Sequence, residues 1–354
     1  MRVTRLERHR RKRRQRIMLV MLTINIIIIL FGSAYLTFVF GPWNWISNIR
    51  SAWVETAMTS AEHQWLATAF IPSSIIDSIM SKAVRTSEAD DSYEININSK
   101  EIMRVYSKYS EGDLDIAGNK IFDVNIHNKV AVAFIEGDGY KGKALIVFDP
   151  SLVRIVHTPY KGEIGQNILD ITEYNDAIAG MNASGFNDPN GVGSGGSVVA
   201  KSRASYEDWG WYSEDFDTIG LNSDNKLLVG YRPDWDSDVI GDACQFSPVL
   251  IQNGRINVSG TAGWGIQPRT AIGQREDGTI IMIVIDGRQP SHSFGINMEQ
   301  LAKEFKKYDC INAAACDGGS SSIMAYDGEI ITSCSSPQDG GRYLPNAFIV
   351  DRIY

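Results

Sequence analysis

The chain has 354 residues of globular composition, 44% hydrophobic and 21% charged, with 42 acidic against 34 basic side chains. Residues 1–16 hold nine of the Lys/Arg and one Glu, so the remainder carries 41 acidic and 25 basic side chains, a net charge of −16. An acidic body repels the phosphates of nucleic acid, which excludes nucleic acid as the expected partner.

An uncharged run of 24 residues, Ile17 to Phe40, follows the basic end. About 20 apolar residues cross a bilayer, so residues 17–40 predict a transmembrane helix. The basic residues 1–16 before it and Trp43 and Trp45 after it predict a cytoplasmic N-terminus and an extracytoplasmic body. The alternative is a cleaved signal peptide, which usually has a shorter apolar core and a small-residue cleavage site. The length of this run favours an uncleaved anchor.

Residues 41–92 predict a helical stem and linker that lead to a domain at 93–354. Apolar residues recur at helical spacing in the stem: Ile46, Ile49, Trp53 and Ala57. Pro72 breaks the chain before a second short helix, and the polar residues Glu88 to Asp91 indicate the linker. A spacer is the simpler interpretation of the stem, and dimerisation or docking on a membrane partner is the alternative.

Apolar runs between turn residues predict the strands of the domain. Residues 129–136 and 143–148 predict a hairpin across Gly137 to Tyr140. The other expected strands are 152–157, 227–231, 248–251 and 345–350. We expect the last of these to join the main sheet.

The most informative stretch predicts a strand, a helix and a second strand. The apolar run 279–285 ends at Asp286, and the run 310–316 ends at Asp317. Between them Asn297 is expected to cap a helix, with Gln300 as its capping-box partner. A βαβ unit has parallel strands, whose C-terminal ends lie at one edge of the sheet, where open α/β sheets bind ligands. We therefore expect the two carboxylates to lie about 5–10 Å apart, as in pairs of acids that catalyse hydrolysis.

These motifs resemble the phosphodiester glycosidase family. The segments that carry the resemblance are Arg269-Thr270-Ala271-Ile272-Gly273, Asp286-Gly287-Arg288, Ser293-Phe294-Gly295 and Asp317-Gly318-Gly319-Ser320-Ser321. Ser320 departs from the family pattern, which has a third glycine there. Asn182, Phe186 and Arg342 also match the family. The resemblance covers about residues 95–354 and implies removal of N-acetylglucosamine from a sugar-1-phosphodiester.

The resemblance and the chemistry of the side chains imply a role for each site residue. Asp286 and Asp317 are the catalytic acid and base candidates, and the sequence leaves open which is which. The expected substrate-binding residues are Arg269, Arg288 and Arg342 for phosphate, Asn182 and Ser321 for sugar or phosphate, and Gly318 and Gly319 for close backbone approach. A Ser321 nucleophile is an alternative, although His292, the nearest histidine, is not part of the family pattern.

Other candidate features are weaker. The glycine-rich run Gly191 to Gly196 suggests a lid or a close backbone approach to the ligand, and a nearby aromatic group suggests a sugar platform: Trp209, Trp211 and Tyr212. The four cysteines lack the spacing of a metal site, and no pairing can be assigned. The acidic stretch Asp113 to Asp123 does not have EF-hand spacing. The sequence requires no cofactor and assigns no metal ligand, and a divalent cation is left open.

The sequence thus predicts an α+β fold: a mixed β-sheet domain containing a βαβ unit with flanking helices, preceded by one transmembrane helix and a helical stem. The expected function is that of a membrane-anchored extracytoplasmic hydrolase of sugar-1-phosphodiesters, acting in cell-surface or exopolysaccharide metabolism by analogy with the family. The alternatives are a sugar-phosphate transferase in polymer assembly and a non-catalytic polysaccharide-binding protein. The oligomeric state is left open.

Overall fold

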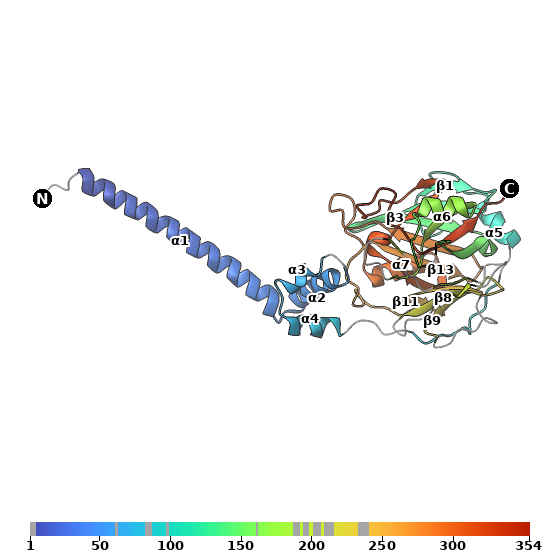
Figure 1. Ribbon diagram of the computed structural model, residues 1–354, viewed down its shortest axis with the longest axis horizontal. Helices are drawn as coiled ribbons and strands as arrows, with labels where there is room; N and C mark the ends of the chain where they lie inside the picture. Colours follow the sequence, from blue (N-terminus) through green and yellow to red (C-terminus); the bar gives the residue numbers. More distant parts are fainter. Residues whose placement is uncertain are drawn as a thin grey trace. The chain divides into compact units, whose positions relative to one another are not determined.

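The computed structural model describes residues 5–60, 63–81, 87–96, 99–160, 162–186, 192–193, 198–200, 207–208, 216–232 and 241–354 (Figure 1). The chain divides into two compact units, Met1–Ile79 and Met80–Tyr354. The predicted glycine-rich lid, apart from residues 192–193, and the predicted aromatic platform at 209–212 lie outside the described residues.

The first unit is helical. It contains α1 (Arg5–Phe40), α2 (Asn44–Met58) and α3 (Trp65–Thr68), and α4 (Ser73–Met80) follows after Pro72. Residues Arg11–Phe40 of α1 have the length and composition to cross a membrane. The guanidinium Nη1 of Arg50 donates to the carbonyls of Phe38 and Val39, each at 3.0 Å. This contact satisfies carbonyl groups that the end of α1 leaves without helical partners.

The second unit is built on three antiparallel sheets. The eight-stranded sheet has the order β1 (Ile121–Asn125), β2 (Val130–Gly137), β3 (Tyr140–Val147), β14 (Ile280–Ile285), β13 (Arg269–Arg275), β15 (Cys310–Cys316), β11 (Val249–Gln252), β12 (Arg255–Ile256). The second sheet has the order β17 (Glu329–Ile330), β16 (Met324–Tyr326), β5 (Ala177–Asn182), β18 (Asn346–Asp351), β4 (Val153–His157). The third has the order β7 (Glu207–Asp208), β6 (Val198–Ala200), β10 (Asp242–Phe246), β8 (Asp217–Leu221), β9 (Leu227–Gly230). The helices of this unit are α5 (Ser99–Tyr106), α6 (Ile168–Tyr174) and α7 (Met298–Lys307).

The expected βαβ unit is present as β14, α7 and β15. Asn297 and Gln300 form the predicted capping box at the start of α7. Strands β14 and β15 each pair antiparallel with β13, so they run parallel to each other with β13 between them. The predicted hairpin is also confirmed, since β2 and β3 pair antiparallel. The α+β fold class is therefore confirmed.

The expectation that the C-terminal strand joins the main sheet is wrong. Strand β18 lies between β5 and β4 in the second sheet, with Ala347 opposite Asn182. The alternation of apolar residues in a strand shows that it is buried but does not select its partner strands. The position of β18 matters for the site because it helps to fix the end of β5, where Asn182 lies.

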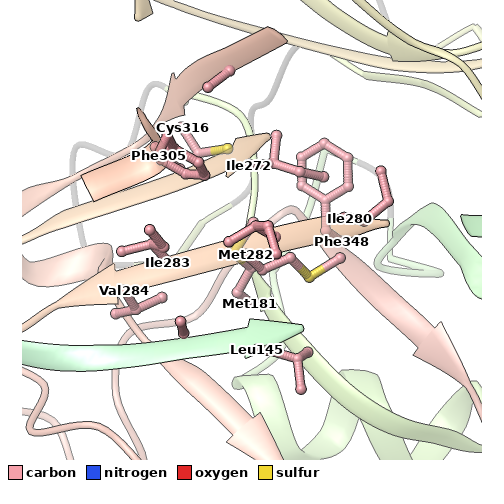
Figure 2. Packing of buried hydrophobic residues seen from close by; sticks show 14 of the residues in the cluster. Leu145, Met181, Ile272, Ile280, Met282, Ile283, Val284, Phe305, Cys316 and Phe348 are labelled. Atoms are coloured by element: carbon pink, nitrogen blue, oxygen red, sulfur yellow. The ribbon is translucent and has the colours of Figure 1, made fainter. Parts of the chain in front are cut away.

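One core joins the eight-stranded sheet to the second sheet (Figure 2). Ile272 and Met282 face each other across β13 and β14, and they share a cluster with Met181 of β5 and Phe348 of β18. All four side chains are fully buried. Burial of an apolar side chain of this size contributes about 1.5–3 kcal/mol, so this cluster holds the strand ends at the candidate site in place.

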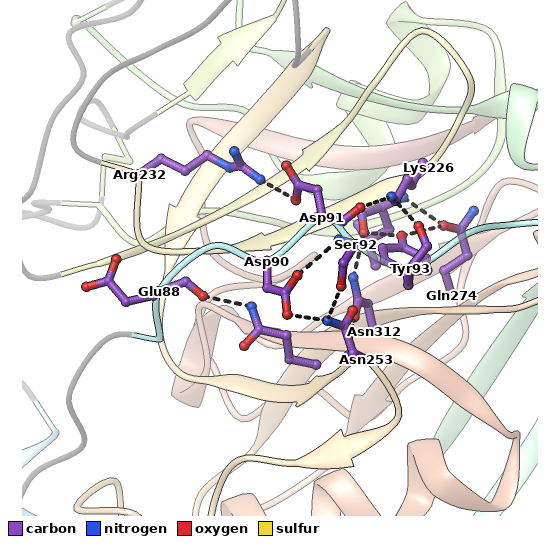
Figure 3. Close-up of polar contacts among 12 residues, drawn as sticks. Glu88, Asp90, Asp91, Ser92, Tyr93, Lys226, Arg232, Asn253, Gln274 and Asn312 are labelled. Atoms are coloured by element: carbon purple, nitrogen blue, oxygen red, sulfur yellow. Dashed lines mark hydrogen bonds and ion pairs between the residues drawn. The ribbon is translucent and has the colours of Figure 1, made fainter.

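Residues 87–96, which we call the strap, lie along the second unit (Figure 3). Asp91 accepts from Arg232 at 2.6 Å, and Asp90 accepts from Asn253 at 2.5 Å. The hydroxyl of Tyr93 is buried and donates to the carbonyl of Leu227 at 2.5 Å. The residues expected to form a linker before Tyr93 therefore make specific contacts with the domain.

A fragment that starts after the strap should be less stable than one that includes it. Residues 94–354 would lose the burial of Tyr93, worth about 1.5–3 kcal/mol, and the 2.9 Å hydrogen bond from the backbone of Ser87 to buried Asp217, worth about 1 kcal/mol. We expect its free energy of unfolding in urea to be lower by roughly 3 kcal/mol than that of residues 80–354. A fragment of residues 87–354 is the control and should match residues 80–354. Equal stability of all three fragments would contradict the structural role of the strap.

Candidate active site

Three strand ends bring the main site residues to one edge of the eight-stranded sheet. Asp286 follows β14, Asp317 follows β15, and Arg269 begins β13 between them. Because β13 is antiparallel to both neighbours, its first residue lies beside their last residues, and Arg269 pairs with Ile285. The axes of β14 and β15 are two interstrand spacings apart, about 10 Å. The parallel strand ends place both aspartates at one edge, as expected, with an arginine strand between them.

Asp317 is surrounded by hydrogen-bond donors and cations. Its Oδ1 accepts from the backbone of Gly318 at 2.9 Å, and its carboxylate also accepts from the Ser321 side chain. The charges of Arg342 and Arg269 stabilise its ionised form. Burial outweighs these contacts and raises the pKa of Asp317 to about 6. Asp317 can therefore exchange a proton near neutral pH.

Arg269 is a buried cation, with an exposed fraction of 3%. Its Nη2 donates to the carbonyls of Trp264 at 2.5 Å and Gly265 at 3.1 Å, whereas its buried Nε has no partner among the described residues. Burial and the like charge of Arg288 lower the pKa of Arg269 to about 9, against the attraction of Asp317. Arg269 still carries its charge at neutral pH, and an anion would satisfy the unpaired N–H group.

Arg288 lies beside the glycine turn that follows Asp317. Its Nε donates to the side chain of Gln267 at 2.9 Å. Gly319 has a φ of +63°, and a Cβ atom there would lie 3.1 Å from Nη2 of Arg288. A larger residue at 319 would therefore strain the backbone and crowd the guanidinium. Because the charges of Arg288 and Asp317 both act on Arg269, these three groups form one cluster.

Arg342 completes the cluster from the loop before β18. Its Nη1 donates to the hydroxyl of Ser321 at 3.2 Å, and its guanidinium stacks over the ring of Phe186 at 5.0 Å from the centroid. Ser321 is thus held by Arg342 and Asp317. A histidine-activated Ser321 nucleophile has no support in these contacts, because His292 is paired with Asp286.

Asn182 holds the Asp317 loop. Its Nδ2 donates to the main-chain carbonyl of Asp317 at 2.7 Å, and its Oδ1 accepts from the Thr270 hydroxyl at 2.7 Å and the Ile323 backbone at 3.2 Å. It is 1% exposed. These contacts assign Asn182 the positioning of Asp317, while contact with substrate stays a prediction.

The backbone N–H groups of the glycine turn are also engaged. Gly318 donates to the Asp317 carboxylate, and Gly319 donates to the carbonyl of Pro268 at 2.9 Å. Both N–H groups are therefore already hydrogen bonded within the protein in this conformation. The lack of side chains still allows close packing, since a Cβ at Gly318 would lie 3.0 Å from the same Pro268 carbonyl.

Asp286 forms a pair with His292. The distance from Asp286 Oδ2 to His292 Nε2 is 2.7 Å, and Oδ1 accepts from the Ser333 backbone at 2.8 Å. Burial raises the pKa of Asp286 above its usual value, and the hydrogen bonds from His292 and Ser333 oppose this shift. Neither His292 nor Ser333 was expected to have a role in the site. His292 lies in the loop after Asp286 and could have been found by proximity, whereas Ser333 carries no local signal.

The described residues contain no group of three or more His, Cys, Asp or Glu side chains placed to hold a metal ion. The four cysteines are free thiols, and Cys244, Cys310 and Cys316 are buried. Cys334 is half-buried, and its Sγ donates to the carbonyl of Ser320 at 3.3 Å. The side chains gathered at the site present carboxyl, imidazole and guanidinium groups.

The fold and site define an α+β domain of antiparallel sheets, rather than the expected mixed sheet, with aspartates and arginines gathered at one sheet edge. A family model described as phosphodiester glycosidase matches residues 175–351, half of the chain. The chain belongs to this family.

Curated relatives match part of the chain. A Bacillus subtilis protein, the SPbeta prophage-derived uncharacterized protein YomE, is 28% identical over 187 residues, 48% of this chain and 27% of its own length. Human N-acetylglucosamine-1-phosphodiester alpha-N-acetylglucosaminidase is 27% identical over 166 residues, 41% of this chain and 30% of its own length. The chain thus spans less than a third of the length of these relatives.

Among solved structures, the zebrafish N-acetylglucosamine-1-phosphodiester alpha-N-acetylglucosaminidase catalytic domain, auto-inhibited by its pro-peptide, is similar with a TM-score of 0.49 and 18% identity. The similarity covers 63% of this chain and 82% of that chain. A hypothetical protein from Synechocystis is similar with a TM-score of 0.45 and 14% identity, over 65% of this chain and 63% of that chain.

Proposed function

We propose that the chain hydrolyses sugar-1-phosphodiesters, with N-acetylglucosamine-1-phosphodiester as the first substrate to test. The observation that carries the proposal is the cluster of Arg269, Arg288 and Arg342 around Asp317, a carboxyl group whose pKa burial raises to about 6. Guanidinium groups match the oxygen atoms of phosphate, and the substrates that relatives' names specify are phosphodiesters.

In this proposal Asp317 acts on the leaving group. It lies among the arginines that we assign to phosphate, so the departing phosphate oxygen would be close to its carboxyl group. A phosphate monoester has a second pKa of about 6, and the pKa of Asp317 is raised to about 6 by burial. Proton transfer is efficient between groups of matched pKa near the working pH. Asp317 would thus donate a proton to the phosphate as the anomeric C–O bond breaks.

Asp286 lies on the opposite side of Arg269, where water would be activated. A separation of about 10 Å between the strand ends exceeds the roughly 5 Å of glycosidases that use a carboxylate nucleophile. The spacing of the strand ends is closer to the roughly 6.5–9.5 Å between carboxyl groups that leaves room for a water molecule. The arrangement therefore favours direct attack of water, with inversion at the anomeric carbon, over a covalent sugar–enzyme intermediate.

We also propose that residues 17–40 anchor the chain in the cell membrane, with residues 1–16 in the cytoplasm and the domain outside. The helix Arg11–Phe40 has the required length and composition, and the positive charges precede the apolar run, which is the arrangement expected for a cytoplasmic N-terminus. A domain outside the membrane would meet cell-surface or exopolysaccharide substrates. Labelling of single introduced cysteines in intact cells tests this topology, and labelling of the domain only after lysis would contradict it.

The test of the proposed activity uses the full chain in detergent and the methyl diester of N-acetylglucosamine-1-phosphate. We expect the wild type to release free sugar and methyl phosphate, and Asp317→Asn to release far less. Asp224→Asn, an exposed turn position, is the matched control and should behave as wild type. The assay is run with and without chelator to test for a divalent cation.

Two other outcomes would point to the alternatives. Transfer of the sugar phosphate to an added polysaccharide acceptor, without free sugar, would identify a transferase. Saturable polysaccharide binding with neither release nor transfer would identify an assembly protein and contradict the proposed activity.

A further inference from the structure

The carboxylate of Asp286 is poorly placed to accept a proton from water. Both of its oxygens are already hydrogen bonded, Oδ2 to His292 and Oδ1 to the Ser333 backbone. The residue is only 7% exposed. The group that reaches solvent from this pair is the imidazole of His292, whose side chain is 36% exposed.

The pairing fixes which imidazole nitrogen can act. The Asp286 carboxylate accepts hydrogen bonds, so Nε2 of His292 carries the proton that it shares with Oδ2. Nδ1 is then the free acceptor of the neutral ring, and it has no hydrogen-bond partner among the described residues. A carboxylate that orients one nitrogen of an imidazole and stabilises its protonated form is the arrangement that makes histidine an effective base.

The loop that carries His292 is held in place by its own hydrogen bonds. The backbone N–H groups of His292 and Ser293 donate to the carbonyl of Gln289 at 2.9 and 2.8 Å. The Gln289 side chain makes two hydrogen bonds to Ser333. Its Nε2 donates to the Ser333 carbonyl at 2.9 Å, and its Oε1 accepts from the Ser333 hydroxyl at 2.8 Å. The same Ser333 backbone holds Asp286, so the orientation of the pair is fixed from two sides.

Residues 333–334 connect the Asp286–His292 pair to the arginine cluster of Arg269, Arg288 and Arg342. Ser333 contacts Asp286, and the next residue, Cys334, donates to Ser320, which directly precedes the Ser321 that holds Arg342. The charges of Asp286, from the pair, and of Arg342, from the arginine cluster, both act on Cys334. Lys143 of β3 is a cation near the pair, and its charge acts on Asp286. A single hydrogen-bonded segment thus links the pair to the arginine cluster.

We propose that His292 is the base that activates water in the hydrolysis proposed above, and that Asp286 is a positioning residue that acts through it. In this step a water oxygen attacks the anomeric carbon and a water proton passes to Nδ1 of His292. The bond from the anomeric carbon to the phosphate oxygen breaks, and its electron pair leaves with the phosphate, which takes a proton from Asp317. The products are free sugar and a phosphate monoester, and solvent later removes the proton from His292 and returns one to Asp317.

The test compares kcat, KM and their pH profiles for full-length wild type and His292→Gln. Glutamine can donate to Asp286 but cannot take up a proton. We expect kcat to fall about 10²-fold or more with KM little changed, and the acidic limb of the kcat profile to disappear. Added imidazole should restore part of the activity of His292→Ala. Asp286→Asn should lower kcat but keep an acidic limb, because His292 remains.

The control is His127→Gln, since His127 is exposed and contacts only the carbonyl of Ile353 at 3.0 Å among its described hydrogen-bond partners. It should match the wild type. The role of His292 is overturned if the wild type is active and His292→Gln keeps the same kcat and the same acidic limb. That result leaves the proposed function standing. Failure of the wild type to release sugar overturns both. The thermal unfolding of each variant is measured to distinguish a loss of activity from a loss of folded protein.

Discussion

Replacement of Asp317 by asparagine is expected to lower kcat by about 10²–10⁴-fold, the range for loss of a general acid. The variant should also lose one limb of the pH profile. Burial raises the pKa of Asp317 to about 6, so in the wild type the protonated, acidic form decreases as the pH rises through about 6. The kcat/KM of the wild type should therefore fall on the alkaline side of pH 6, and that of Asp317→Asn should not.

The chemistry of the leaving group gives a sharper form of this prediction. A nitrophenyl phosphate diester of the sugar departs as a more acidic phosphate than the methyl diester and needs less protonation. If Asp317 is the acid, the ratio of wild-type to Asp317→Asn rates should be smaller for the nitrophenyl substrate. Equal ratios for the two substrates would place Asp317 elsewhere in the mechanism. Asp224→Asn should show neither effect.

The local elements of the βαβ unit could be predicted because their signals are local. The apolar runs at 280–285 and 310–316 each end at an Asp-Gly dipeptide, and the pairing of Asn297 with Gln300 requires residues only three positions apart. The gathering of Asp286 and Asp317 at one edge followed from the rule that parallel strands share an edge. The position of β13 between β14 and β15 could not be predicted in the same way, because pairing between strands is set by tertiary packing.

The contacts that decide the roles of the site residues were beyond reach of the sequence. Ser333 lies 47 residues from Asp286, and Asn182 lies 135 residues from Asp317. No local pattern indicates that Asn182 uses its amide to hold a loop or that both oxygens of Asp286 are occupied. The sequence pointed to Asp286, Asp317 and Arg269, which the strands bring to one sheet edge, whereas the acid, base and positioning roles that we propose rest on the contacts between side chains.

Stability considerations set the expectation for Arg269. A buried guanidinium without an anion partner costs free energy, since its charge has left water and its Nε is unpaired among the described residues. Methionine has a similar length and no charge. Replacement by methionine would remove the free-energy cost of burying this charge. It would also leave the carbonyls of Trp264 and Gly265 without their Arg269 donor, which costs free energy in turn. The free energy of unfolding of Arg269→Met should therefore stay within about 2 kcal/mol of the wild type.

Binding of phosphate should respond far more strongly. Each charge-assisted hydrogen bond from Arg269 contributes about 1.5–3 kcal/mol, so Arg269→Met should weaken the Kd for N-acetylglucosamine-1-phosphate by about 10²-fold in calorimetric titration. Arg269→Lys keeps the charge but loses the planar guanidinium group with its paired donors. Its Kd should lie between those of the wild type and Arg269→Met. Arg255→Met, at an exposed position of β12, is the control and should bind as wild type. An unchanged Kd for Arg269→Met would make Arg269 a structural residue and leave phosphate binding to Arg288 and Arg342.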